Sequence, residues 1–92
     1  MGYTIYYKTN VDKWEGAIAF LSRVCKGLRW NFKIRARGDV IIIPDFKKVE
    51  ILVIPKKGSG FVKTYGIEPY TTLYLLILHS LNAFGSVEII ED

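Results

Sequence analysis

The sequence predicts an α+β domain in which an antiparallel sheet carries two helices on one face. Several short segments alternate apolar and polar residues, the pattern of strands with one buried side. Two longer segments repeat apolar residues at helical spacing, and glycine or proline separates most segments from the next. The resulting order is β-α-β-β-β-β-α-β. The 92 residues are enough for one hydrophobic core, so residues 1–92 are expected to form a single domain.

The first half of the chain predicts two strands and one helix. Residues 3–8, YTIYYK, are aromatic and β-branched and indicate the first strand. Asp12 and Glu15 stand at the spacing of a capping box, and apolar residues then recur at helical spacing until Gly27. Apolar and polar residues alternate without a break over 28–37, which predicts a strand with its cations on one face.

The second half predicts four more strands and one helix. The strands are expected at residues 40–43, 49–54, 61–65 and 87–90. Lys56–Gly60 is interpreted as a turn, and the second helix is expected to begin at Glu68 and end near Ala83. Two β-α-β units then flank a hairpin, which resembles a ferredoxin-like arrangement with an added hairpin. Because such crossovers are right-handed, both helices should lie on one face.

Positive charge is concentrated in the middle of the chain. The net charge is +4, but residues 23–63 hold eleven basic side chains against three acidic ones. The basic residues of interest are Arg29, Lys33, Arg35 and Arg37 on the predicted strand, and Lys56 and Lys57 in the later turn. Strand residues two apart are separated by roughly 6.6 Å, close to the phosphate repeat of an extended single strand. The row predicts a nucleic-acid surface, with a solvated face or a surface for an acidic protein as alternatives.

Residues 57–64, KGSGFVKT, resemble the RNP1 string of RNA-recognition motifs. The matching positions are Lys57, Gly58, Gly60, Phe61 and Val62, whereas Ser59 and Thr64 stand where that family has aromatic residues. The resemblance implies that Phe61 and an aromatic residue of the first strand form a stacking platform, with Lys57 against the nucleic-acid backbone. A hairpin turn that binds nothing is the alternative for this stretch.

The second helix is apolar almost all round. Tyr70, Leu73 and Ile77 fall on one stripe, while Leu75 and Leu76 fall outside it. Two of the predicted strands are also apolar on both sides. A homo-oligomer, most simply a dimer, is therefore expected through this helix or through the sheet surface. The alternative is that other parts of the same chain cover these surfaces.

Catalytic chemistry has little support in the sequence. His79 and Cys25 are the only residues of their types, and neither has a partner at a recognisable spacing. No nucleophile motif or P-loop is present, so we expect no enzymatic activity, no metal and no cofactor. The single cysteine and the absence of a signal peptide or membrane-spanning run favour a soluble cytoplasmic protein. The lack of Gln and the excess of Ile and Lys are typical of thermophile proteins.

These observations predict a small, non-catalytic, self-associating domain that binds nucleic acid weakly and without strong sequence preference. The expected binding residues are Arg29, Lys33, Arg35, Arg37, Lys56, Lys57 and Phe61. The alternative is an assembly or adaptor subunit with no nucleic-acid role, whose basic face would meet another protein.

Overall fold

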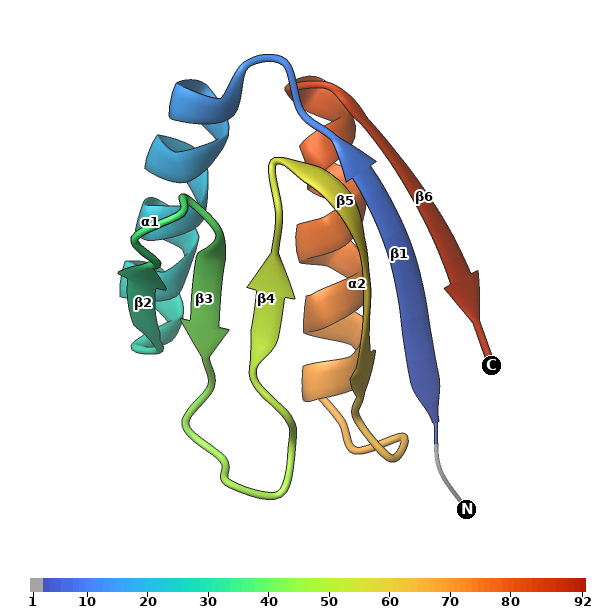
Figure 1. The fold of residues 1–92 in the computed structure, drawn as a ribbon. Helices are drawn as coiled ribbons and strands as arrows, with labels where there is room; N and C mark the ends of the chain where they lie inside the picture. The colour runs from blue at the N-terminus through green and yellow to red at the C-terminus, as the bar shows by residue number, and fades with distance from the viewer. Residues whose placement is uncertain (1–2) are drawn as a thin grey trace.

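The computed structural model describes residues 3–92, and its elements follow the predicted order (Figure 1). They are β1 (Thr4–Asn10), α1 (Trp14–Leu28), β2 (Asn31–Ile34), β3 (Val40–Ile43), β4 (Leu52–Ile54), β5 (Lys57–Lys63), α2 (Tyr70–Ser80), a short 3-10 helix (Leu81–Ala83) and β6 (Ser86–Glu91). The α+β class and the order β-α-β-β-β-β-α-β are thus confirmed.

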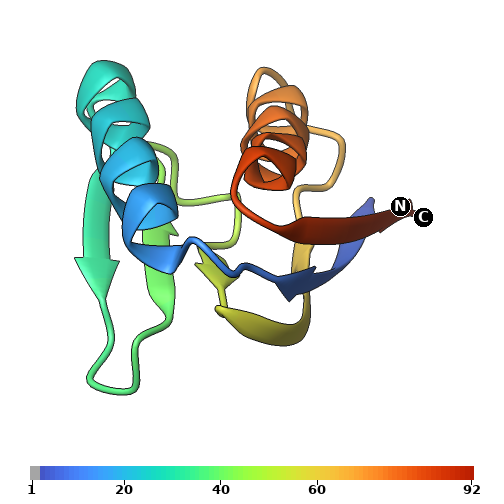
Figure 2. The ribbon, with the colours of Figure 1, turned by 90° about the horizontal axis from the view of Figure 1, so that it is seen from above.

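The strands form two antiparallel three-stranded sheets, where the sequence predicted one. The first sheet has the order β5-β1-β6 and the second the order β2-β3-β4. Both helices lie on the same side of the strands, as predicted (Figure 2). The ferredoxin-like arrangement is not confirmed, because the strands pair in two separate ladders.

Side chains of β1 take the place of a hydrogen-bonded ladder between β4 and β5. The Tyr7 hydroxyl donates to the carbonyl oxygen of Val53 at 2.5 Å, and Thr9 Oγ1 donates to that of Pro55 at 2.6 Å. Gly60 lies opposite Tyr7 in β5, and a Cβ there would lie 3.0 Å from the Tyr7 hydroxyl. Glycine therefore leaves room for the phenol beside β5, and the two hydroxyl groups satisfy carbonyl oxygens of β4 and of the residue that follows it.

The predicted turn Lys56–Gly60 is wrong in its position. β5 already begins at Lys57, and its glycines pair with β1 as ladder residues. The chain turns at Pro55 and Lys56 instead, where the Lys56 carbonyl oxygen accepts a 2.8 Å hydrogen bond from the Val11 amide. Lys57 and Phe61 consequently lie on one continuous strand.

The predicted strand 28–37 is wrong in its extent at both ends. α1 continues past Gly27, and Arg29 ends it in a left-handed conformation with φ of 62°. The Trp30 amide then donates to the Cys25 carbonyl oxygen at 2.9 Å, as in many helix ends. The strand is shorter than predicted because the helical spacing of the last turn overlaps the alternation that follows it.

The β2–β3 hairpin closes through a three-residue loop, Ala36–Gly38. The Arg35 amide donates to the Asp39 carbonyl oxygen at 2.8 Å, and the Gly38 amide donates to that of Arg35 at 2.8 Å. Gly38 has φ of 101°, which glycine adopts without strain at the end of such a loop. The hairpin extends beyond the sheets on the side away from the helices (Figure 2).

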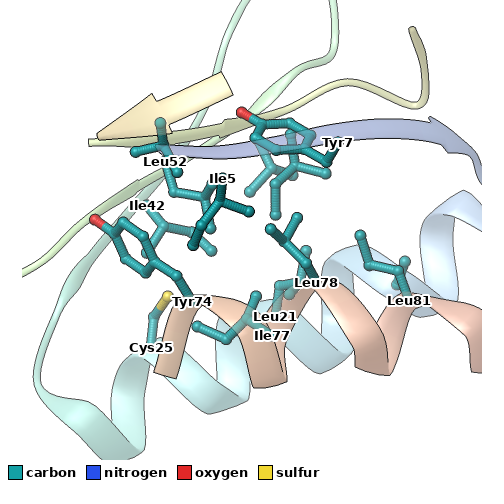
Figure 3. Packing of buried hydrophobic residues seen from close by; sticks show 14 of the residues in the cluster. Ile5, Tyr7, Leu21, Cys25, Ile42, Leu52, Tyr74, Ile77, Leu78 and Leu81 are labelled. Carbon is teal, nitrogen blue, oxygen red and sulfur yellow. The ribbon is translucent and has the colours of Figure 1, made fainter. Parts of the chain in front are cut away.

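The core lies between the strands and the two helices (Figure 3). Ile5 of β1, Leu21 of α1 and Leu78 of α2 are fully buried. Tyr74 is the largest fully buried side chain, and its hydroxyl donates to the Glu50 carbonyl oxygen at 2.6 Å. No helix within residues 3–92 has the length and apolarity needed to cross a bilayer.

Candidate nucleic-acid interface

The face of sheet β5-β1-β6 that turns away from the helices is open to solvent. β1 buries Ile5 and Tyr7, so the intervening Tyr6 and Lys8 point to the opposite side. β5 alternates in the same way and exposes Phe61. We call this surface the outer face, and its residues are Tyr6, Lys8, Asn10, Lys57, Ser59, Phe61, Lys63, Glu88 and Ile90.

Three exposed apolar side chains form a row across the outer face. Tyr6 lies opposite Phe61 of β5 on one side and opposite Ile90 of β6 on the other. Their exposed fractions are 43 % for Tyr6, 58 % for Phe61 and 68 % for Ile90. The Tyr6 and Phe61 ring centroids are 6.0 Å apart with an interplanar angle of 40°. A patch of large, solvent-exposed apolar side chains is typical of a binding surface.

Charged side chains border this row. A shallow depression of about 500 Å³ extends over the row and also reaches Lys8, Ser59 and Glu88. Lys8 lies opposite both Ser59 and Glu88 in the two ladders, so one cation and one acid flank the apolar centre. Lys57 and Lys63 are exposed at the two ends of β5. The outer face therefore joins flat aromatic rings to nearby ammonium groups, the combination that binds bases and phosphates.

The hairpin loop adds a further cation beside Phe61. We call the space between the loop and β5 the hairpin pocket; it has a volume of about 240 Å³ and is lined by Arg37, Asp39, Val53, Pro55, Ser59 and Phe61, with Tyr7 and Gly60. Arg37 Nε donates to Asp39 Oδ2 at 3.1 Å. The Arg37 side chain is 78 % exposed and that of Asp39 only 12 %. One guanidinium thus stands next to the aromatic row.

The structure brings together some of the predicted binding residues and separates others. Phe61 and Lys57 lie on the outer face, Arg37 lies beside it, and Arg35 and Lys33 are exposed on the β2–β3 hairpin. Arg29 stands at the end of α1, and Lys56 lines a separate depression with Asp12 and Glu15 at the start of α1. The predicted row of four cations on one strand is wrong, since of the four only Lys33 lies in β2.

Sequence reasoning expected an aromatic residue of the first strand beside Phe61 without deciding which one, and it missed Lys8, Ile90 and Asp39 as members of this region. The alternation in TIYYKTN places Tyr6 and Lys8 on one side of a strand. It does not say which side meets solvent, because Tyr7 on the other side is equally aromatic. No local signal marks Asp39, whose position depends on the hairpin loop.

A second apolar surface lies on the opposite side of the molecule, between the two helices. Its residues form a groove of about 230 Å³ and include Phe20, Val24, Leu28, Leu73, Leu76 and Ile77. We call it the helix groove. Leu76 is 59 % exposed, whereas Ile77 and Leu78 are buried against the core. The apolar excess of α2 is thus partly covered by the core and partly exposed here.

The single cysteine and the single histidine lie away from the outer face. Cys25 is buried in the core, and burial raises the pKa of its thiol to about 11, which disfavours the reactive thiolate. His79 is exposed in the last turn of α2. Residues 3–92 contain no group of three or more His, Cys, Asp or Glu side chains placed to hold a metal ion. The outer face is therefore the best-developed candidate site of the described chain.

Comparison with protein-family models, with curated proteins and with solved structures found no match.

Proposed function

We propose that the protein is a non-catalytic domain that binds single-stranded nucleic acid on its outer face, weakly and with little sequence preference. The observation that carries this proposal is the exposed pair Tyr6 and Phe61, whose rings lie side by side on an open sheet. A base stacked on an aromatic side chain contributes about 1–3 kcal/mol, and every base has a face that can stack.

The surrounding cations support the same ligand. Lys57 and Lys63 lie on the strand that carries Phe61, and Arg37 lies beside it. Cations near a stacking surface contact phosphates, which adds affinity that depends on salt and not on sequence. Bases of a duplex are already stacked on each other and cannot cover these rings. The chemistry thus favours single strands over duplex DNA.

Fluorescence anisotropy of labelled single-stranded RNA, single-stranded DNA and duplex DNA tests the proposal. We expect micromolar binding of the single strands at about 50 mM salt, falling roughly 20-fold at about 200 mM if three cations contact phosphates. Phe61→Ala should weaken binding by about 5- to 150-fold, the range of one stacked base. The double variant Arg35→Glu/Arg37→Glu should also weaken it and flatten the salt dependence.

Phe46→Ala is the matched control for Phe61→Ala. Phe46 is also a partly exposed phenylalanine, but its ring stacks on Tyr70 with centroids 5.4 Å apart, away from the outer face. This variant should bind like the wild type. Absence of binding to every strand at low salt, or equal affinity of Phe61→Ala and Phe46→Ala, would overturn the proposal.

The helix groove supports the self-association that the sequence predicts. Leu76 projects from α2 beside a groove lined almost entirely by apolar side chains. A second copy that docks its own α2 there would cover both Leu76 side chains and leave both outer faces free, because the helices lie on the other side of the strands. Sedimentation at several concentrations should show a dimer that Leu76→Glu makes monomeric; a monomer at every concentration would contradict it.

The same groove is the observation that favours the alternative function, an assembly or adaptor subunit. In that case a different protein would occupy the helix groove and the outer face would bind no nucleic acid. Salt separates the two functions: nucleic-acid binding weakens steeply as salt rises, whereas docking of apolar surfaces does not.

A further inference from the structure

The hairpin pocket has a feature that general nucleic-acid binding does not use. The Asp39 carboxylate is largely shielded from water, and Arg37 Nε is its single hydrogen-bond donor within residues 3–92. A carboxylate can accept several hydrogen bonds, and one that is shielded and only partly satisfied favours a ligand with N–H groups. Asp39 is also the one acid among the residues that line the hairpin pocket.

Arg37 presents the complementary group at the same place. One N–H of its guanidinium donates to Asp39 Oδ2, and the others of its five donors remain for a ligand, since the side chain is 78 % exposed. The pair thus offers hydrogen-bond donors directly beside an acceptor. A ligand that fits must carry an acceptor directly beside one or two donors.

The size and lining of the hairpin pocket suit one base. Its volume of about 240 Å³ corresponds to about eight waters at about 30 Å³ each, which is room for a single base. Val53, Pro55 and Phe61 supply apolar walls. Because Phe61 and Ser59 also line the depression over the aromatic row, the pocket continues directly from the stacking surface.

We propose that the hairpin pocket binds one guanine base of the single strand held on the outer face, an inference that rests on the proposed function. Guanine carries the O6 and N7 acceptors next to the N1–H and N2–H₂ donors, so Arg37 can donate to O6 while Asp39 accepts from the N–H groups. Adenine has a donor where guanine has O6. Uracil has the acceptor but only one adjacent donor, and cytosine has no ring N–H to donate.

Ten-nucleotide RNAs that differ at one central position test this inference. The strands are all uridine, or uridine with one central guanosine, inosine or adenosine, and anisotropy gives a dissociation constant for each. We expect guanosine to tighten binding about 5- to 10-fold over the all-uridine strand, a typical gain from one well-placed base contact. Inosine, which lacks the N2 amino group, should gain about half as much on a logarithmic scale, and adenosine should gain nothing.

The readout for variants is the ratio of the guanosine and all-uridine dissociation constants, so a general change in affinity cancels. Asp39→Asn should bring this ratio close to one. Arg37→Lys, which keeps the charge at an exposed position, should reduce it as well, and covers the case in which Asp39→Asn does not fold. Asp12→Asn removes the same charge from an exposed acid at the start of α1 and should keep the wild-type ratio.

The possible results separate this inference from the function on which it rests. Binding of all strands without a guanosine preference, or a preference that survives both Asp39→Asn and Arg37→Lys, overturns the guanine pocket and leaves the stacking surface in place. Failure of every strand to bind overturns the proposed function itself and the pocket with it.

Discussion

Replacing Tyr7 by phenylalanine tests how the two sheets are joined. The variant keeps the buried ring but removes the hydroxyl that donates to the Val53 carbonyl oxygen at 2.5 Å. A buried acceptor left without its donor costs about 1–3 kcal/mol. We therefore expect Tyr7→Phe to lower the free energy of unfolding at neutral pH by about 1.5 kcal/mol, or roughly 6–12 °C in Tm for a domain of this size.

As the pH rises from neutral to alkaline, the free energy of unfolding should fall less for Tyr7→Phe than for the wild type. Burial raises the pKa of Tyr7 from 10.0 to about 12, so the folded state holds the phenolic proton more tightly than the unfolded state. This contribution to stability is complete below pH 10.0 and is lost as the pH rises toward about 12. At about pH 11 the wild type has lost about 1.4 kcal/mol that phenylalanine cannot lose. At this pH the difference in free energy of unfolding between Tyr7→Phe and the wild type should therefore nearly vanish.

Urea denaturation of both proteins at neutral pH and at about pH 11 measures the two effects. Tyr6→Phe is the matched control, because Tyr6 is the neighbouring tyrosine on the exposed side of β1 and should contribute little to stability. The wild type and Tyr7→Phe share every other titratable group, so those groups cancel in this comparison. No penalty at neutral pH, or a penalty of the same size at both pH values, would refute the reasoning.

Three further substitutions or modifications test the packing. Gly60→Ala should destabilise the protein by about 1–3 kcal/mol in urea or thermal unfolding, because its Cβ would lie 3.0 Å from the buried Tyr7 hydroxyl; unchanged stability would contradict the crossing of β5 by that side chain. Gly27→Ala should instead stabilise it by about 0.5–1 kcal/mol, since the site is inside α1 and a Cβ there meets nothing within 4 Å. Cys25 should react with a thiol reagent only as fast as the protein unfolds, whereas rapid labelling of the native state would show that the thiol is accessible.

Local patterns in the sequence were sufficient for the class and order of the elements. The helical spacing after Asp12 and the apolar run 40–43 each predicted an element that is present. The predicted ends of helices and strands were wrong where two local sequence patterns overlap. Glycine is a typical residue at a helix end, yet α1 continues past Gly27 to Leu28, and Arg29 takes the left-handed conformation that ends the helix.

The candidate site was harder to predict because it depends on pairing between distant segments. Gly58 and Gly60 read locally as a turn, but both pair with β1 as strand residues, and the Tyr7 side chain needs the space beside Gly60. The register of β1 against β5 brings Tyr6 next to Phe61, and a shift of one residue would have brought Tyr7 there instead. No local pattern contains that register. The basic residues were visible in the sequence, but their grouping was not.

The two sheets also differ in how far apart along the chain their partners lie. β2, β3 and β4 follow one another, whereas in the other sheet Ile5 lies opposite Val62 and Glu91. Loop-closure entropy must be overcome before such distant contacts form, so we expect β2-β3-β4 to fold early and β5-β1-β6 to assemble late. The outer face would then be the last surface to form, and a strand of nucleic acid bound across β5, β1 and β6 would hold the sheet closed and slow its opening.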